Sequence, residues 1–489
     1  MPPTLALLLW FVLLFGLLYF DPAKKRGTSL ALWVPVTWMF FVGTRAPSLW
    51  IGGQVGSAAE AFTEGNSLNL SVFLGLTIVA LGILISRSFR WDSFFTQNLA
   101  LTAFLFFALA SVLWSDFPLV TFKRWSRDVG GYLVVLVALS DRDLLEGVRT
   151  VLRRFCYLAI PLSVLLVKYY PGLAKVYDAW TGVPMATGAT TSKNMLGASC
   201  VVAGVFFFWD LVMRWPNRAD RQTRRILLVD VAFIWMTLWL LHQASSATSN
   251  VCLVIGCFVI AAAATKTFKR HPTFFKVLIP TTFCSYVILA YWFNANAYLV
   301  GAVGRNPTLT DRTFIWRTLL NIGTNPVVGT GYRSFFLGER LQAFWMTFPG
   351  INEAHNGYLD IYLSLGMVGV VLLLVFLVAG YLTIWKRFRF SPPLASLGLA
   401  IWTVLLFYDI TEAAFDVGLL WLSLMLLGIA VPGLSAERAR SAAPSESVGM
   451  RERFPRSNSE PAGLGNRYTS DRPSLDMHSI PPRNLLKRT

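Results

Sequence analysis

The feature that most restricts how this chain can fold is its series of apolar segments, which reach membrane-spanning length with few or no charges. Hydrophobic residues make up 55% of the 489 residues, and a soluble core does not need so many uninterrupted apolar stretches. The sequence therefore predicts an all-α polytopic membrane protein with about 12 to 13 transmembrane helices. Several segments are shorter than a full crossing, so one or two can be tilted, merged or interfacial. The segments cover residues 4–20, 30–43, 68–85, 97–114, 128–140, 155–168, 194–213, 226–243, 250–265, 277–297, 357–385, 394–410 and 417–433.

The Lys and Arg residues predict the orientation of these helices. Loop 21–29, the alternate loops after it and the tail 434–489 together hold 31 of the 43 Lys and Arg residues. Because positive charge collects on the cytoplasmic side, we expect a periplasmic amino terminus, a periplasmic loop over 298–356 and a cytoplasmic carboxy terminus. The tail is rich in Ser, Pro and Arg and lacks periodicity, which predicts a disordered basic extension of a transmembrane domain over 1–433.

Other compositional features exclude several classes of protein. The net charge of +17 is explained by the topological bias of Lys and Arg, so we expect no nucleic-acid partner. The five cysteines lie in or beside apolar segments without a CxxC pair, which is typical of buried hydrophobes rather than disulfides or metal ligands. The chain has no GxxxxGK[ST] phosphate loop. Its first segment lacks the basic region and cleavage site of a signal peptide, so we expect a retained helix.

Basic residues are few on the external side, so their positions indicate function. An arginine fork binds two phosphate oxygens at once, which suits an anion carried on a lipid. The alternative is a set of solvated or interfacial side chains, which we favour for Arg333 and Arg340. Eight of the 12 external basic residues lie in two places: Arg305, Arg312, Arg317, Arg333 and Arg340 in the long loop, and Lys123, Arg124 and Arg127 in the short loop after Trp114.

Within the long loop, the stretch GRNPTLTDRTFIWR (304–317) predicts a turn at its Asn-Pro pair followed by a helix. Arg312 and Trp316 are four residues apart and share one face of that helix, whereas Arg317 lies about 140° away from Arg312. We therefore expect Arg312 to face a site packed by Trp316 and Arg317 to point elsewhere.

Of the four histidines, His242 and His355 are expected on the external side. His355 directly precedes an apolar segment and so lies at the membrane surface, where an imidazole can take a proton from a hydroxyl near neutral pH. The alternative is that His355 only caps a helix or lies at the surface, and we expect His242 to bond a neighbouring helix. Glu353 can orient His355 or be solvated. Two distant histidines without an HExxH or DxD motif predict no metal cofactor.

Several motifs carry a family resemblance. His355-Asn356, nine residues and then GMVG (366–369) match the H-[NSQ]-x9-G-x-x-G pattern of the O-antigen ligase family. GRNPTLTDRTFIW and NPVVGTGYRSFF resemble the Arg-rich stretch and P-x-x-G-x-G turn of Wzy-type exopolysaccharide polymerases, which belong to the same superfamily. SVLWSDFPLVTFKRW and TGATTSKNMLG resemble the family's WS-x-x-P and K-N-x-x-G segments. The resemblance covers roughly residues 100–430, in family order.

The resemblance implies a metal-independent, GT-C-type membrane glycosyltransferase of the bacterial inner membrane, with an undecaprenyl-diphosphate-linked glycan as donor. It also implies that His355 is the catalytic base and that Arg312 binds the diphosphate. Many relatives carry Arg or Lys in an S-[RK]-[TG] motif where this chain has Ala247, within HQASSATSN; Lys193 or Arg124 would then replace that cation. The expected substrate-binding residues are Arg312, Arg305, Lys193, Arg124 and Asn356.

The reaction implied is an inverting transfer, in which His355 deprotonates an acceptor hydroxyl while Arg312 and Arg305 hold the diphosphate. We expect polymerisation of exopolysaccharide or O-antigen, because TLTDRTFIW looks closer to the exopolysaccharide polymerases. An O-antigen ligase that transfers glycan to lipid A-core is the first alternative. A flippase or transporter is the second, disfavoured because few charged residues, notably Asp230 and Asp409, lie inside spans. The expected partners are the lipid-linked donor, a glycan or lipid-linked acceptor, the bilayer and polysaccharide export machinery.

Overall fold

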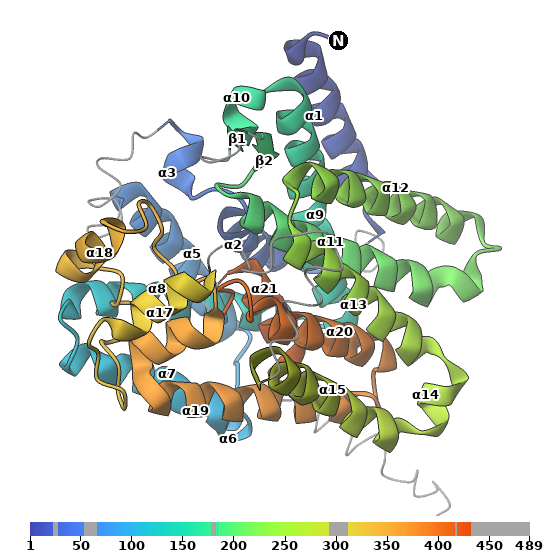
Figure 1. Cartoon of the computed structure of the whole chain (residues 1–489). Coiled ribbons are helices and arrows are strands. Elements are labelled where there is room, and N and C mark those ends of the chain that lie inside the picture. Colours follow the sequence, from blue (N-terminus) through green and yellow to red (C-terminus); the bar gives the residue numbers. More distant parts are fainter. Residues whose placement is uncertain are drawn as a thin grey trace, which may run out of the picture. The chain divides into compact units, whose positions relative to one another are not determined.

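The computed structural model describes residues 1–22, 28–52, 66–177, 182, 184–292, 312–415 and 418–431. The chain divides into a unit over Met1–Ser435 and a second unit over Ala436–Thr489. The second unit, which contains nearly all of the expected cytoplasmic tail, lies outside the described residues, and so does Arg305. All of the described helices and strands belong to the first unit (Figure 1).

Helices dominate the described residues, and each apolar segment that the sequence predicts to cross the membrane corresponds to a helix. The protein is therefore an all-α polytopic membrane protein, as expected. The helices are α1 (Pro3–Tyr19), α2 (Trp33–Gly43), α3 (Pro47–Trp50), α5 (Ser67–Ser86), α6 (Trp91–Gln97), α7 (Leu99–Ala110), α8 (Pro118–Leu139), α9 (Leu144–Tyr169), α10 (Pro171–Ala174), α11 (Lys193–Arg214), α12 (Arg221–Ala244), α13 (Ala247–Ala264), α14 (Lys266–Arg270), α15 (Pro272–Trp292), α17 (Arg312–Asn321), α18 (Gly338–Trp345), α19 (Gly357–Arg387), α20 (Pro392–Tyr408) and α21 (Leu419–Gly428).

Length and composition allow seven of the described helices to cross a membrane, or eight if α6 and α7, bent by 94° at their junction, form one broken span. Four shorter apolar helices accompany them: α1, Leu30–Gly43, α20 and α21. The expected number of about 12 to 13 spans includes these shorter helices. An unpredicted two-stranded antiparallel sheet, β1 (Lys175–Tyr177) with β2 (Pro184–Ala186), leads into α11.

Two helices begin earlier than their apolar segments suggest. Helix α8 begins at Pro118 rather than near residue 128, and α9 begins at Leu144 rather than near residue 155. Proline suits the first turn of a helix, and the Asp143 side chain caps α9 by accepting a hydrogen bond from the amide of Glu146 at 3.1 Å. Lys123, Arg124 and Arg127 therefore lie on a helix, not in the short loop that the sequence predicted.

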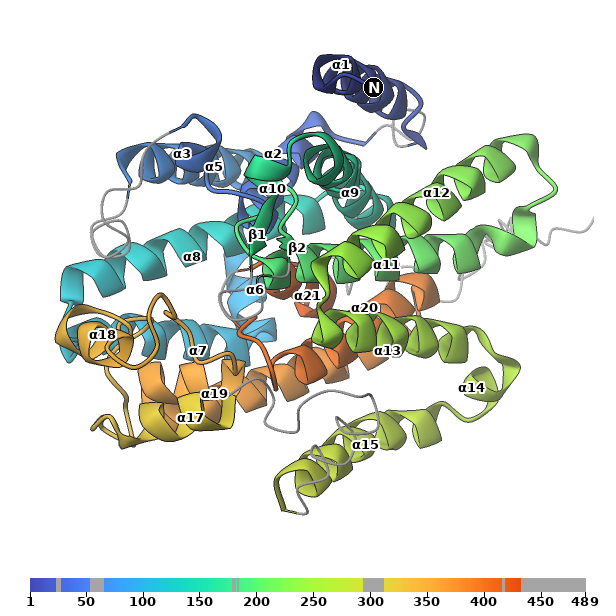
Figure 2. The same cartoon turned by 45° about the horizontal axis from the view of Figure 1, so that its top comes forward.

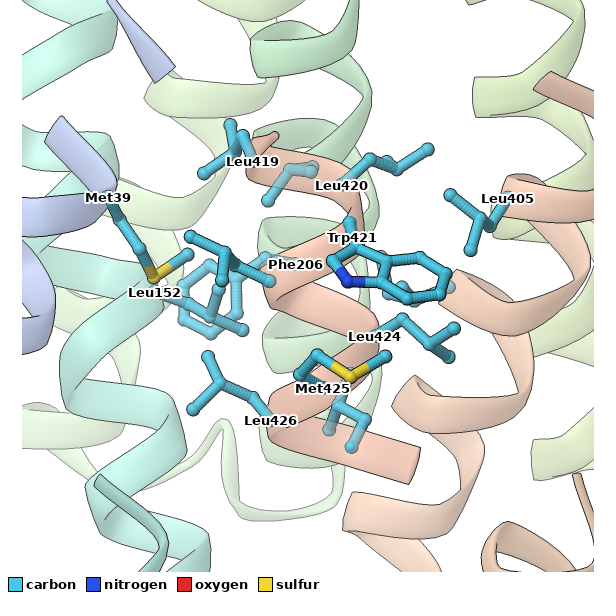
Figure 3. Close-up of a cluster of buried hydrophobic side chains, with 14 of the residues drawn as sticks. Met39, Leu152, Phe206, Leu405, Leu419, Leu420, Trp421, Leu424, Met425 and Leu426 are labelled. Atoms are coloured by element: carbon cyan, nitrogen blue, oxygen red, sulfur yellow. The ribbon is translucent and has the colours of Figure 1, made fainter. Parts of the chain in front are cut away.

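Helix α21 forms the centre of the core. Every one of its ten residues is buried, and α2, α8, α11, α19 and α20 contact it. Figure 3 shows Trp421 and its neighbours on α21 among Met39, Phe206 and Leu405. The indole of Trp421 also donates a hydrogen bond to the hydroxyl of Tyr132 at 2.8 Å. Since lipid tails are as apolar as these side chains, close packing rather than water exclusion holds this cluster together.

A break in α19 positions the loop that precedes α18. Gly366 has a left-handed φ of 62° and interrupts the helix. The loop 325–331 fills the break: the amide of Met367 donates to the carbonyl of Pro326 at 2.9 Å, and the amide of Gly331 donates to the carbonyl of Ser364 at 2.9 Å. The backbone groups that the break releases are thus paired again, which a membrane protein requires. The two glycine motifs of the sequence, 326–331 and 366–369, meet at this junction.

We expect Gly366→Ala to destabilise the protein by about 1–3 kcal/mol, because a Cβ would lie 2.3 Å from the carbonyl of Val327 on a left-handed backbone. Gly75→Ala is the matched control, since Gly75 lies within α5 and a Cβ there meets nothing within 4 Å. Thermal unfolding midpoints in detergent should fall for Gly366→Ala and stay level or rise for Gly75→Ala. Equal midpoints for the two variants would contradict the assignment of the break as a structural junction.

Candidate active site

His355 lies in the loop between α18 and α19 in a strained backbone conformation. Its φ of 50° places a non-glycine residue in the left-handed region, which costs of the order of 1 kcal/mol or more. Contacts on Ala354 hold the loop in place: its carbonyl accepts from the indole of Trp316 at 2.9 Å, and its amide donates to Asp360 at 2.9 Å. Strain that the surroundings maintain in this way is typical of functional sites.

The residue after His355, not His355 itself, caps α19. The side-chain oxygen of Asn356 accepts a hydrogen bond from the amide of Leu359 at 3.0 Å. The alternative in which His355 only caps the helix is therefore wrong. The expected role of Asn356 in substrate binding stays a prediction, because its side-chain oxygen already serves the helix terminus.

The first turn of α19 packs closely against the loop that follows α20. The amide of Gly357 donates to the carbonyls of Asp409 and Glu412, each at 2.9 Å. A Cβ on Gly357 would lie 1.9 Å from the Asp409 carboxylate, so this close approach requires glycine. The contact brings the side chain of Glu412 beside His355.

Glu412 contacts three side chains from three parts of the chain. One of its carboxylate oxygens lies 2.7 Å from the guanidinium of Arg312. The other accepts a hydrogen bond from Asn194 at 2.8 Å and lies 3.6 Å from Nδ1 of His355. The Glu412 side chain is only 5% exposed, and a carboxylate buried to this extent needs such partners. Figure 2 shows the helix that carries Arg312, α17, alongside the first part of α19.

None of the motifs recognised in the sequence contains Glu412. It follows α20 closely, in the stretch YDITEAAFD, and is 100 residues from Arg312. The available signal was a carboxylate at the end of an apolar segment on the side expected to be periplasmic, where a buried acid needs a cation. Only the folded chain identifies that cation.

A second carboxylate contacts the same imidazole. Nδ1 of His355 lies 2.8 Å from Glu353, which the sequence had left as either an orienting or a solvated residue. Burial lowers the pKa of His355, but Glu353 and Glu412 stabilise the imidazolium more strongly and raise the pKa to about 9. The imidazole therefore carries a proton at neutral pH in the site as it stands.

The ligand atoms of Glu353, His355 and Glu412 lie within 4.8 Å of one another, close enough together to hold a metal ion. Arg312 already contacts one oxygen of Glu412, and its positive charge would repel a divalent cation at that position. We interpret the cluster as an ion-pair network. Metal independence remains a prediction.

The other expected binding residues are distributed over two places. Lys193 begins α11, and its ammonium lies 3.0 Å from the sulfur of Met185; its neighbour Asn194 bonds Glu412. Arg124 instead donates to the carbonyl of Arg333, in a separate group of residues. Lys193 and Arg124 were the two residues expected to replace the cation that is missing at Ala247. Of these two, Lys193 lies next to a residue, Asn194, that hydrogen-bonds Glu412.

The segment around Ala247 borders that network. The Thr248 hydroxyl hydrogen-bonds that of Thr411 at 2.8 Å, next to Glu412. His242, expected to bond a neighbouring helix, has an exposed side chain instead.

Two arginines expected to be solvated or interfacial form ion pairs. Arg333 lies 3.0 Å from Asp128, and Arg340 lies 2.6 Å from Asp116. Each carboxylate comes from a segment about 200 residues earlier in the chain, so no local pattern pairs them. The interfacial position of both arginines stays a prediction.

Fold and site together define a multi-span helical membrane protein in which Arg312 and His355, both partly exposed, gather around the buried carboxylate of Glu412 at helix ends. Residues 179–374 match the sequence family described as O-Antigen ligase (Wzy_C), a segment that contains Asn194, Arg312 and His355. The chain is 24% identical over 309 residues to the exopolysaccharide production protein ExoQ of Rhizobium meliloti, across 60% of this chain and 66% of that protein, slightly less than two thirds. Over these segments the chain is similar to the O-antigen ligase and Wzy-type family.

We expect Arg312→Lys to lower glycan product by about 10-fold or more, because an ammonium cannot reproduce the planar fork that contacts Glu412 while binding phosphate. Arg317→Lys is the control, since Arg317 lies on the same helix with an exposed side chain and should keep product within about two-fold of wild type. Product is measured in cells at matched expression. Equal losses in the two variants would show that the helix face is wrongly assigned.

Proposed function

We propose that the protein polymerises lipid-diphosphate-linked polysaccharide repeat units at the periplasmic face of the inner membrane, by metal-independent, inverting glycosyl transfer. The observation that carries the proposal is the convergence of Arg312, His355 and Asn194 on the buried carboxylate of Glu412. A phosphate-binding fork and a proton acceptor are the two groups that such a transfer needs. The proposed donor is an undecaprenyl-diphosphate-linked glycan.

The arrangement of the imidazole assigns a role to each of its nitrogens. Nδ1 faces Glu353 and Glu412, which favours the tautomer with a proton on Nδ1 and leaves Nε2 as the base. Nε2 takes the proton of the acceptor hydroxyl, whose oxygen attacks the anomeric carbon of the donor. The bond from that carbon to the diphosphate breaks, and the bonding electrons leave with the diphosphate. Arg312 stabilises the leaving group, and the two glutamates stabilise the imidazolium that forms.

The test of this assignment is His355→Asn. Asparagine tolerates the left-handed backbone that His355 adopts, so the loop should fold, but its amide cannot take up a proton. Turnover of purified protein in proteoliposomes should fall by about 10²–10⁴-fold. Product near the wild-type level at matched reconstitution would remove the catalytic assignment.

The pH dependence of turnover tests whether His355 is the base, because the carboxylates beside it raise its pKa. With a pKa of about 9, only about 1% of the imidazole is neutral at pH 7, so turnover should rise with pH up to about pH 9. Glu353→Gln removes one charge that stabilises the imidazolium and should shift this rise to lower pH. Chelator should leave the profile unchanged. A profile that Glu353→Gln does not move would show that the titrating group is not His355.

Polymerase is preferred over ligase. The relative is named an exopolysaccharide production protein, which fits polymerisation better than transfer to lipid A-core. Proteoliposomes that contain a lipid-linked repeat unit as the sole substrate discriminate between the two. A ladder of longer glycans supports the polymerase, and product that appears only after lipid A-core is added supports the ligase.

A transporter is disfavoured by how the helix breaks are closed. Transporters use unwound helices to expose backbone groups to a cavity. At the junction of α6 and α7, however, Asn98 exchanges two hydrogen bonds with the backbone of Ala430, at 2.9 and 3.0 Å, and the break at Gly366 is filled by the loop 325–331. Both breaks are therefore structural junctions.

The proposal requires the Glu412 network to face the periplasm, with the tail inside. In a Cys284→Ser background, which removes an exposed thiol, Thr347→Cys should react with an impermeant thiol reagent in intact cells, because Thr347 is exposed on the side where Lys and Arg are few. Ser470→Cys in the tail should react only after lysis. Labelling of Ser470→Cys in intact cells would overturn the orientation.

A further inference from the structure

Arg45 lies in the turn between α2 and α3 and hydrogen-bonds two other segments of the chain. Its Nε donates to the carbonyl of Thr190 at 3.3 Å, and its Nη2 donates to the carbonyl of Gly188 at 3.3 Å. The same Nη2 also donates to the carbonyl of Leu173, in α10. Among the residues that the structure describes, Arg45 pairs with no carboxylate. Backbone carbonyls are therefore the groups that this arginine binds.

The loop that Arg45 contacts is buried and has a tight backbone. Residues 187–190 are all buried, so their backbone carbonyls need hydrogen-bond donors from the protein. Gly188 has a left-handed φ of 57°, and a Cβ there would lie 2.8 Å from the side chain of Ser163. The hydroxyl of Ser163 accepts a hydrogen bond from the amide of Ala189 at 3.2 Å. Because Ser163 belongs to α9, that helix and Arg45 hold the loop together.

The loop also determines where α11 begins. The hydroxyl of Thr190 donates to the carbonyl of Ser192 at 2.8 Å. The hydroxyl of Ser192 caps α11 by accepting a hydrogen bond from the amide of Met195 at 3.1 Å. The first turn that this cap supports carries Asn194, whose side chain donates to Glu412 at 2.8 Å. A continuous series of contacts thus leads from Arg45 to the Glu412 carboxylate.

Other helices hold α11 along its length. A Cβ at Gly197 would lie 2.1 Å from the hydroxyl of Ser249, so α11 and α13 approach closely in the second turn. In the first turn, the hydroxyl of Tyr408 donates to the backbone carbonyl of Asn194 at 3.0 Å. The loop 187–192 supplies the restraint at the helix end. The segment TGATTSKNMLG (187–197) therefore combines a close helix contact with a fixed helix start.

We propose that Arg45 is a positioning residue for the transfer reaction. By fixing the loop 187–192, Arg45 aims the side chain of Asn194 at the carboxylate of Glu412. That carboxylate contacts the phosphate-binding fork and the base of the proposed reaction, so the inference rests on the proposed function. Arg45 is also one of the 12 basic residues expected on the external side, the side on which the reaction is proposed to occur.

Hydrogen exchange measured by mass spectrometry tests the structural step without requiring turnover. Arg45→Met keeps the apolar stem and removes every donor, so the amides of residues 187–196 should exchange about 10-fold faster than in wild type. Arg87→Met is the matched control, because Arg87 also donates to a backbone carbonyl, that of Val137 at 2.8 Å, but between α5 and α8. Exchange over 187–196 should stay at the wild-type rate in Arg87→Met. Wild-type exchange in Arg45→Met would overturn the proposal.

A double-mutant cycle on turnover tests the positioning step. Arg45→Met and Asn194→Ala should each lower turnover by about 10-fold, the effect of losing one hydrogen bond to a charged group. Because both changes interrupt the same series of contacts, the combined variant should be no slower than the slower single variant. Arg87→Met should leave turnover within about two-fold, alone or added to Asn194→Ala. Independent losses that multiply to about 100-fold in the Arg45→Met, Asn194→Ala variant would show a merely structural role and overturn the proposal.

A milder variant tests the same series of contacts if Arg45→Met does not accumulate. Thr190→Val replaces a hydroxyl by a methyl group of similar size and removes the hydrogen bond to Ser192. Turnover should fall by about 3-fold to 10-fold, and Asn194→Ala should add little to that loss. Wild-type turnover in Thr190→Val would overturn the proposal. Failure of the proposed function shows differently, as unchanged turnover in His355→Asn, and leaves the hydrogen-exchange result as it was.

Discussion

The burial of one carboxylate organises the candidate site. An isolated charge inside a protein costs several kcal/mol unless cations and hydrogen-bond donors surround it, and Glu412 obtains these from Arg312, Asn194 and His355. Its partners come from α11, from α17 and from the loop before α19. The ends of three helices that are distant in sequence are therefore held together around the Glu412 side chain. Together with Glu353, which lies closer, the same carboxylate also raises the pKa of His355.

Strained backbone conformations and broken helices occur at several of the described residues. His355 and Arg333 both adopt left-handed backbones that glycine would accept at lower cost. The breaks at Asn98 and Gly366 are closed by hydrogen bonds from other segments. Irregular backbone in a membrane protein is stable where other protein groups hydrogen-bond its N–H and C=O groups. The two breaks are therefore rigid junctions between helical segments.

Two of the arginines that pair with a buried carboxylate are Arg312, with Glu412, and Arg333, with Asp128. A carboxylate beside an arginine orients the guanidinium group. Because α19 and the loop 325–331 join the two places, their separation is set by backbone rather than by flexible side chains.

The sequence by itself determined the fold class, because the exclusion of charge from membrane-length segments is a local property that needs no knowledge of partners. It also predicted that His355 directly precedes an apolar segment and that Arg312 lies on a short helix, and the structure has α19 beginning at Gly357 and α17 beginning at Arg312. It could not reveal Glu412, the ion pairs of Arg333 and Arg340, or the elevated pKa of His355. Each of these depends on a partner brought close only by packing, as with the 100 residues between Arg312 and Glu412. Helices α8 and α9 begin before their apolar segments for the same reason. Both helices contain arginines, which a search for apolar segments leaves out, and in the folded chain these arginines pair with Asp128 and Asp210. Hydropathy reports the solvent that each residue prefers, and tertiary structure decides which charges neutralise one another.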